Sequence, residues 1–144
     1  MEMFVYSRAA IERVPPHDVP HVIISITSSR SDRARLPPSE HCRGVLRLTF
    51  LDADQAVDGH AEEDLFSAEQ ADQIWDFVLG QRGAIARVVV HCDAGVSRSP
   101  AVAAALAKTL TGSDAQFFAR YRPNMRVYRT LMNRYHERLG GFAE

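Results

Sequence analysis

The chain has 144 residues and a formal net charge of −1, and 46% of its residues are hydrophobic. This length and composition are typical of one soluble globular domain over residues 1–144, with a sizeable core. The near-zero charge excludes a strongly basic nucleic-acid-binding protein and no apolar stretch could span a bilayer, so neither nucleic acid nor membrane is an expected partner.

Strands dominate the expected structure of the N-terminal third. Residues 4–6 predict a short strand, and Ser7 can cap a brief helix that ends near residue 13. The β-branched run at 21–26 predicts a second strand. A polar loop with two prolines follows, and the alternating run at 45–50 predicts a third strand.

Helices alternate with one further strand in the middle of the chain. Residues 67–70 form a capping box that opens a helix ending near Gly80. A buried strand is expected at 87–91, followed by a helix of small residues at 100–110. The segment between this strand and helix is therefore a short loop at a helix N-terminus.

The C-terminal part is expected to be helical. A second capping box at 113–116 predicts a short helix, and a last helix begins after Pro123. One apolar face of that last helix is formed by Val127, Leu131, Tyr135 and Leu139. Strands that alternate with helices predict an α/β domain with a central, largely parallel sheet flanked by helices.

The most informative segment is the loop after the strand at 87–91, with the sequence His91-Cys92-Asp93-Ala94-Gly95-Val96-Ser97-Arg98-Ser99. It places a cysteine and an arginine at the two ends of a seven-residue loop. Unpaired N–H groups and the helix dipole at this point favour a bound dianion. The same field favours the reactive thiolate of Cys92, so a nucleophile is expected to face a phosphate-binding loop.

This loop resembles the signature of the cysteine-dependent protein tyrosine phosphatases. In detail it is similar to the small dual-specificity-like branch, including its compact bacterial members. The matching residues are His91, the Cys92–Arg98 spacing, Gly95 and Ser99. The resemblance covers roughly residue 45 onward and, more loosely, the N-terminal third. It implies the dual-specificity phosphatase fold and a hydrolysis that needs no metal and no cofactor.

The chemistry of phosphate monoester hydrolysis gives each loop residue a role. Cys92 is expected to attack phosphorus and form a phosphocysteine intermediate, and Arg98 is expected to hold two phosphoryl oxygens with its planar guanidinium. By the resemblance, Ser99 assists breakdown of the intermediate and His91 orders the loop from beneath. The remaining phosphoryl oxygens are expected to bind the main-chain amides of Asp93, Ala94, Gly95, Val96, Ser97 and Arg98.

Several polar residues near the loop could also have a purely structural role. Ser99 and Asn124 also suit a helix N-cap, although the resemblance implies that Asn124 tethers the nucleophile loop. Ser97 is expected to hydrogen-bond within the loop, or else to be merely exposed. The C-terminal arginines are expected to form a solvated helix surface rather than to steer substrate.

The proton donor for the leaving group is expected on the acidic loop after the strand at 45–50. In the resembled family this donor is an aspartate on the loop that follows a strand upstream of the nucleophile. Asp52 comes first after the strand and aligns best, with Asp54 as the alternative. The other acids of this loop are expected to form a solvated surface, namely Asp58, Glu62, Glu63 and Asp64.

The residues that flank Gly95 bear on the substrate class. Phosphoinositide phosphatases of this superfamily place lysines inside the loop, where this chain has Asp93 and Val96. The negative charge of Asp93 disfavours polyanionic head groups and RNA 5′-ends. The expected partner is therefore a phosphorylated protein or peptide, most naturally carrying phosphotyrosine, with phosphoserine and phosphothreonine as further substrates.

Three alternatives to a phosphoprotein phosphatase stay open. One is a catalytically inactive phospho-binding module on the same fold, and another is a phosphatase for a phosphoinositide or an RNA 5′-end. A third is a rhodanese-like sulfurtransferase, which also uses a cysteine loop. Retention of Cys92, Arg98 and a candidate acid argues against the inactive module.

The two cysteines, Cys42 and Cys92, are too few for a disulfide framework. Because the loop needs a free thiolate and residues 1–10 lack the features of a signal peptide, a reducing, cytoplasmic location is expected. A zinc site that joins residues 41–42 to 91–92 matches no standard spacing. No spacing supports Cys42 as a redox partner of Cys92 either.

Overall fold

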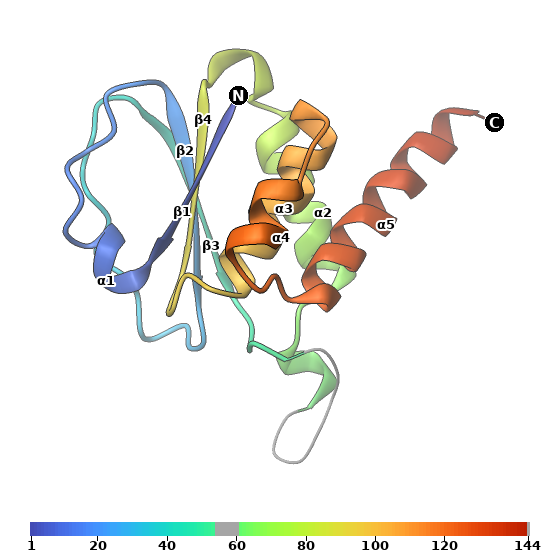
Figure 1. Ribbon diagram of the computed structural model, residues 1–144, viewed down its shortest axis with the longest axis horizontal. Helices are drawn as coiled ribbons and strands as arrows, with labels where there is room; N and C mark the ends of the chain where they lie inside the picture. The colour runs from blue at the N-terminus through green and yellow to red at the C-terminus, as the bar shows by residue number, and fades with distance from the viewer. Residues whose placement is uncertain (54–60, 144) are drawn as a thin grey trace.

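A computed structural model describes residues 1–53 and 61–143 of the chain. Its centre is a parallel sheet of four strands in the order β1-β4-β2-β3 (Figure 1). The strands are β1 (Glu2–Ser7), β2 (His21–Thr27), β3 (Cys42–Thr49) and β4 (Arg87–Cys92). All the predicted strands are present, and the predicted parallel sheet is confirmed.

The helices lie on both faces of this sheet. They are α1 (Arg8–Ile11), α2 (Ala68–Leu79), α3 (Arg98–Thr111), α4 (Ala115–Arg120) and α5 (Met125–Ala143). Two short 3₁₀ turns, η1 (Glu62–Asp64) and η2 (Arg82–Ala84), flank α2. In Figure 1, α1 lies on one side of the sheet, and α2 to α5 gather on the other.

The main core fills the space between the sheet and helices α2, α3 and α5. Strand β2 is buried along its whole length: Ile24 faces this core, whereas Ile23 packs with Ile11 on the opposite face. Such two-sided burial is typical of a strand inside a parallel sheet. Helix α3 is also buried over most of its length, because its alanines allow close packing. The two elements that flank the nucleophile loop, β4 and α3, are thus firmly held.

The two predicted capping boxes have different outcomes. The one at α2 is confirmed, because Ser67 Oγ accepts a hydrogen bond from the Gln70 N–H and Gln70 Oε1 accepts one from the Ser67 N–H. The one at 113–116 is wrong: α4 begins after Asp114, which makes no side-chain cap. Its carboxylate accepts a hydrogen bond from the Tyr128 hydroxyl instead. Burial and Asp114 together raise the pKa of Tyr128 to about 12.

The predicted apolar face of α5 is confirmed only over its first turns. Val127 and Leu131 are fully buried, and the Tyr135 ring lies 4.9 Å from that of Trp75. Leu139, however, is 50% exposed. The reason is that the end of α5 extends beyond the body of the molecule (Figure 1). Among the described residues, no helix combines the length and hydropathy needed to cross a membrane.

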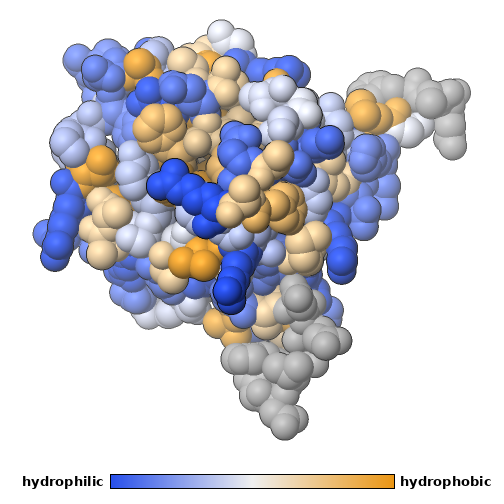
Figure 2. Space-filling view, in the orientation of Figure 1, coloured by the Kyte–Doolittle hydropathy of each residue, from blue (hydrophilic) through white to orange (hydrophobic). Residues whose placement is uncertain are grey.

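On the face seen in Figure 2, hydrophobic residues form small patches between hydrophilic ones. This mixture is ordinary for a protein surface. The polar residues that concern function lie instead at one edge of the sheet, where the parallel strands end.

Candidate active site

The candidate site lies at the carboxyl ends of the strands. Strand β4 ends at Cys92 and helix α3 begins at Arg98, so the loop between them joins two buried elements. The segments that follow β2 and β3 end at the same edge because the sheet is parallel. Open α/β sheets commonly bind ligands at this edge.

Backbone donors surround the sulfur of Cys92. Its Sγ accepts hydrogen bonds from the N–H groups of Gly95 (3.3 Å) and Ser99 (3.4 Å), and the Ser99 hydroxyl lies 3.1 Å away. The residue is only 2% exposed. N–H and O–H donors thus converge on one sulfur, a geometry that suits an anionic acceptor. Ser99 lies inside α3 and not at its N-cap, which is Ser97.

Gly95 permits the close approach of the loop to strand β1. Its φ is +71°, in the left-handed region that favours glycine. A Cβ at this position would lie 2.6 Å from the Ser7 nitrogen and 2.9 Å from the Tyr6 carbonyl carbon. Both neighbours are backbone atoms, which no side-chain rotation can move away.

We expect Gly95→Ala to lower the free energy of unfolding by about 2–4 kcal/mol, the sum of left-handed backbone strain and overpacking. Urea unfolding followed by circular dichroism measures this change. The matched control is Gly83→Ala, because a Cβ at Gly83 has nothing within 4 Å. Equal stability of the two variants would contradict the close packing of the loop on β1.

Arg98 is buried, at 5% exposure, and its guanidinium reaches the segments that follow β2 and β3. Nη1 donates to the Ser28 hydroxyl (3.0 Å) and to the Phe50 carbonyl (2.8 Å). Nη2 donates to the Asp93 carboxylate at 3.0 Å. Nε is buried and has no hydrogen-bond partner among the residues that the structure describes. A buried N–H donor without a partner is rare in proteins, so an acceptor supplied by a ligand would satisfy it.

The Asp93 carboxylate forms an ion pair with Arg98 and so does not extend freely from the mouth of the loop. Asp93 Oδ2 accepts hydrogen bonds from Arg98 Nη2 and from the Ser28 hydroxyl (3.1 Å). A phosphoryl group that uses Nη2 must therefore displace this carboxylate or share the donor with it. The negative charge of Asp93 thus lies directly against the guanidinium of Arg98.

Asp52 lies beside the nucleophile loop and is held by two donors. Its Oδ1 accepts hydrogen bonds from Ser97 Oγ (2.8 Å) and Asn124 Nδ2 (2.9 Å). Among the described residues Oδ2 has no partner, so this oxygen is free to face a substrate. The expectation that Ser97 hydrogen-bonds within its own loop is wrong, because its hydroxyl is taken by Asp52. The alternative acid, Asp54, lies outside the described residues.

Asn124 combines the two roles that its sequence position allowed. Its Oδ1 accepts from the Val127 N–H and thereby caps α5 (3.1 Å). The backbone N–H of Asn124 donates to the Ser97 carbonyl (3.0 Å). This bond tethers the nucleophile loop to the start of α5. Because the same side chain holds Asp52, it couples the candidate acid to the candidate nucleophile loop.

His91 is fully buried beneath the loop. Its Nε2 lies 2.6 Å from the hydroxyl of Ser25 on the neighbouring strand, and its Nδ1 lies 3.4 Å from the Cys92 carbonyl. Burial lowers the pKa of His91, so the ring is neutral at pH 7. These contacts fix the end of β4, which fits a positioning role and not proton transfer.

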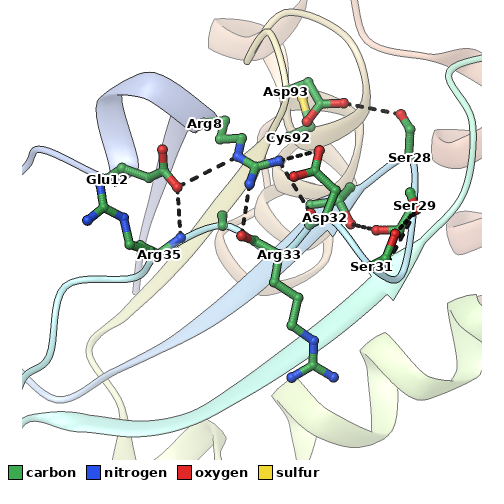
Figure 3. Close-up of polar contacts among 12 residues, drawn as sticks. Arg8, Glu12, Ser28, Ser29, Ser31, Asp32, Arg33, Arg35, Cys92 and Asp93 are labelled. Atoms are coloured by element: carbon green, nitrogen blue, oxygen red, sulfur yellow. Dashed lines mark hydrogen bonds and ion pairs between the residues drawn. The ribbon is translucent and has the colours of Figure 1, made fainter.

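Some residues of this edge were not singled out by the sequence, above all Ser28 and Arg8. The Arg8 N–H donates to the Asp93 carbonyl (3.1 Å), and its guanidinium binds the Asp32 carboxylate (2.8 Å) and the Arg33 carbonyl (2.8 Å). Figure 3 shows Arg8 between the nucleophile loop and the segment after β2. The rule that ligands bind at strand ends was the one available signal for Ser28.

The remaining loop residues lie at the mouth of the site, whereas Cys42 begins β3, at the opposite end of the sheet. Ala94 and Val96 are exposed at the mouth of the loop, and the Val96 carbonyl accepts from the Arg122 N–H (3.0 Å). Cys42 is a free, half-buried thiol that donates to the Gly44 carbonyl. In the parts of the chain that the structure describes, no group of three or more His, Cys, Asp or Glu residues is arranged to hold a metal ion.

Comparison with known proteins shows the fold of this chain. No protein-family model and no curated protein sequence matches it. The solved structure of human DUSP28 matches with a TM-score of 0.62 and 18% identity, covering 96% of this chain and 94% of that one. A human tyrosine phosphatase-like serine/threonine/tyrosine-interacting protein matches with a TM-score of 0.59 and 19% identity, covering 95% and 93%.

PTPMT1, solved in complex with PI(5)P, is similar over 99% of this chain and 95% of its own, with a TM-score of 0.57 and 18% identity. These neighbours share the dual-specificity phosphatase architecture. The chain therefore has the dual-specificity phosphatase fold, and the fold class predicted from the sequence is confirmed.

Proposed function

We propose that this protein is a cysteine-dependent, metal-independent phosphatase that hydrolyses phosphate monoesters on proteins. The observation that carries the proposal is the environment of Cys92 and Arg98. The sulfur accepts two backbone N–H bonds, and the arginine that ends the same loop keeps a buried Nε without a partner. This arrangement fits a nucleophile facing a phosphoryl group.

The first step transfers the phosphoryl group to the enzyme. The Cys92 thiolate attacks phosphorus, the S–P bond forms and the P–O bond to the leaving group breaks. Asp52 gives a proton to the leaving oxygen, and the unpartnered Oδ2 suits this transfer because Oδ1 is held by Ser97 and Asn124. The loop amides and Arg98 stabilise the charge on the equatorial oxygens.

The second step regenerates the enzyme. Water attacks the phosphocysteine, its proton passes to the Asp52 carboxylate, and the S–P bond breaks to release inorganic phosphate. The departing sulfur again becomes an anion, and the Ser99 hydroxyl at 3.1 Å donates to it. His91 takes no part in proton transfer but keeps the end of β4 in place.

A phosphorylated protein or peptide is the substrate class that we favour, with phosphotyrosine first. The Asp93 carboxylate on Arg98 disfavours ligands that bring several phosphates to the nucleophile. A cytoplasmic location accords with a free thiol as nucleophile.

Activity measurements on the intact protein test this proposal. We expect hydrolysis of an aryl phosphate in the presence of EDTA, with loss of activity as iodoacetate alkylates one thiol, and protection by inorganic phosphate. Phosphotyrosine peptides are expected to have a higher kcat/KM than soluble phosphoinositides or RNA 5′-phosphates. Phosphopeptide binding without turnover would instead indicate an inactive binding module, and turnover of thiosulfate would indicate a sulfurtransferase.

A further inference from the structure

A second basic site lies at the same edge of the sheet as Cys92. A pocket of about 340 Å³ is lined by Arg30, Arg33 and Arg47, together with polar residues from β2, β3 and α2. These polar residues are Ser25, Thr27, Thr49, Gln70 and Gln73. We call it the arginine pocket. Its volume is at the lower end of the range for small-ligand sites.

The three arginines of this pocket form no ion pair with the described residues, and Arg47 Nη1 donates to the Ala34 carbonyl (3.2 Å). Among the described residues, no carboxylate lies within ion-pair distance of Arg30, Arg33 or Arg47. The nearest acid in sequence, Asp32, is bound to Arg8 at 2.8 Å. In Figure 3 the side chain of Arg33 points away from that cluster. Burial, and to a lesser extent the charge of Arg33, lower the pKa of Arg47.

Like charges gathered without a counterion favour binding of an anion. Guanidinium groups bind phosphoryl and carboxylate oxygens through paired N–H donors. The side chains of Thr27, Thr49 and Gln73 offer further polar groups in the same pocket. The chemistry of the pocket therefore matches an oxyanion and not a neutral or cationic group.

The arginine pocket is connected to the candidate active site. Arg30 also lines a second cavity, of about 400 Å³, which Ser28 and Phe50 share. Both of these residues accept hydrogen bonds from Arg98 Nη1. On the other side, Ser25 lines the arginine pocket and contacts His91, the neighbour of Cys92 in sequence. The arginine pocket thus lies next to residues that directly contact Arg98 and His91.

We propose that the arginine pocket binds a second oxyanion group of the phosphorylated protein substrate, next to the group that Cys92 attacks. This inference rests on the proposed function and specifies its substrate class. The second group is a carboxylate or another phosphoryl group on a residue near the hydrolysed one. A membrane surface fits less well as the ligand. Its anionic headgroups would also lie close to Glu63 and Asp64, which line the second cavity and would repel them.

Peptide binding to the Cys92→Ser protein tests this inference without requiring turnover. Each fluorescent peptide carries one phosphotyrosine. In the reference peptide its neighbours are neutral. In two further series, a glutamate or a second phosphorylated residue is placed at successive positions on either side of the phosphotyrosine. We expect the best-placed second anion to lower Kd about tenfold at low salt, the gain typical of one charge-assisted contact. The glutamate and phosphate series identify which oxyanion the pocket prefers.

The double substitution Arg33→Gln and Arg47→Gln is expected to remove this gain. The matched control is Arg43→Gln, on the same strand but outside the pocket, where Nη1 donates only to the Glu40 carbonyl. The inference is overturned if the gain is absent, if it survives the double substitution, or if phosphoinositide vesicles and not peptides depend on Arg33 and Arg47. A wild-type protein without phosphatase activity would overturn the proposed function alone, since the binding gain is measured independently.

Discussion

Replacement of Cys92 by serine is expected to lower kcat by about 10⁴-fold or more while the protein still binds phosphate. A serine hydroxyl is somewhat smaller than the thiol and can still accept from the Gly95 and Ser99 N–H groups, but it is not ionised at neutral pH. The chemical step therefore fails and the anion cradle persists. Steady-state hydrolysis of an aryl phosphate and a binding titration with orthovanadate measure the two effects.

The matched control for this substitution is Cys42→Ser. Cys42 is the other free cysteine, and its contact is to the Gly44 carbonyl, remote in sequence from the nucleophile loop. We expect its kcat to stay within about twofold of the wild type, as for substitutions away from functional groups. Rapid acid quench of the wild type with labelled substrate should trap phosphate on one cysteine. Substantial turnover by Cys92→Ser would remove the proposed nucleophile.

The strands and the nucleophile loop could be predicted because their signals are local. The run at 21–26 is β-branched and apolar on both faces, as befits a strand buried on both sides, and β2 indeed occupies the interior of the sheet. The Cys92–Arg98 segment combines spacing with a strand before and a helix after. The capping box at 113–116 failed because α4 begins one residue later than predicted, after Asp114, so that the Ser113 hydroxyl accepts from the Ala115 N–H and not from the Gln116 N–H.

The support of the site could not be predicted from local patterns. Asn124 and Asp52 are 72 positions apart, and a hydrogen bond between two loops leaves no periodicity in the sequence. The partners of Arg98 are a serine hydroxyl and a backbone carbonyl, from the ends of two other strands. Only the sheet order, with β4 next to β2 and β2 next to β3, brings these groups to one arginine. Long-range topology thus supplies the geometry, whereas local sequence supplies the reactive groups.

Replacement of Asp52 by asparagine is expected to lower kcat for phosphotyrosine peptides by about 10²–10³-fold, the range for loss of a general acid. Asparagine keeps an oxygen for Ser97 and Asn124 but has no acidic proton for the leaving oxygen. The limb of the pH–rate profile that the general acid sets should disappear. An aryl phosphate with a good leaving group should lose less activity than the peptide, since its leaving oxygen needs the proton less.

Two further variants separate this role from a general effect of charge. Glu63→Gln removes an exposed carboxylate from the same acidic segment, and we expect it to leave the pH–rate profile unchanged. Asp54→Asn tests the alternative acid directly. Loss of the pH limb in Asp54→Asn, with the limb retained in Asp52→Asn, would move the acid to residue 54.

If Asp52 is the acid, Asn124→Ala should weaken peptide turnover more than aryl phosphate turnover, because it frees the carboxylate that Nδ2 holds at 2.9 Å.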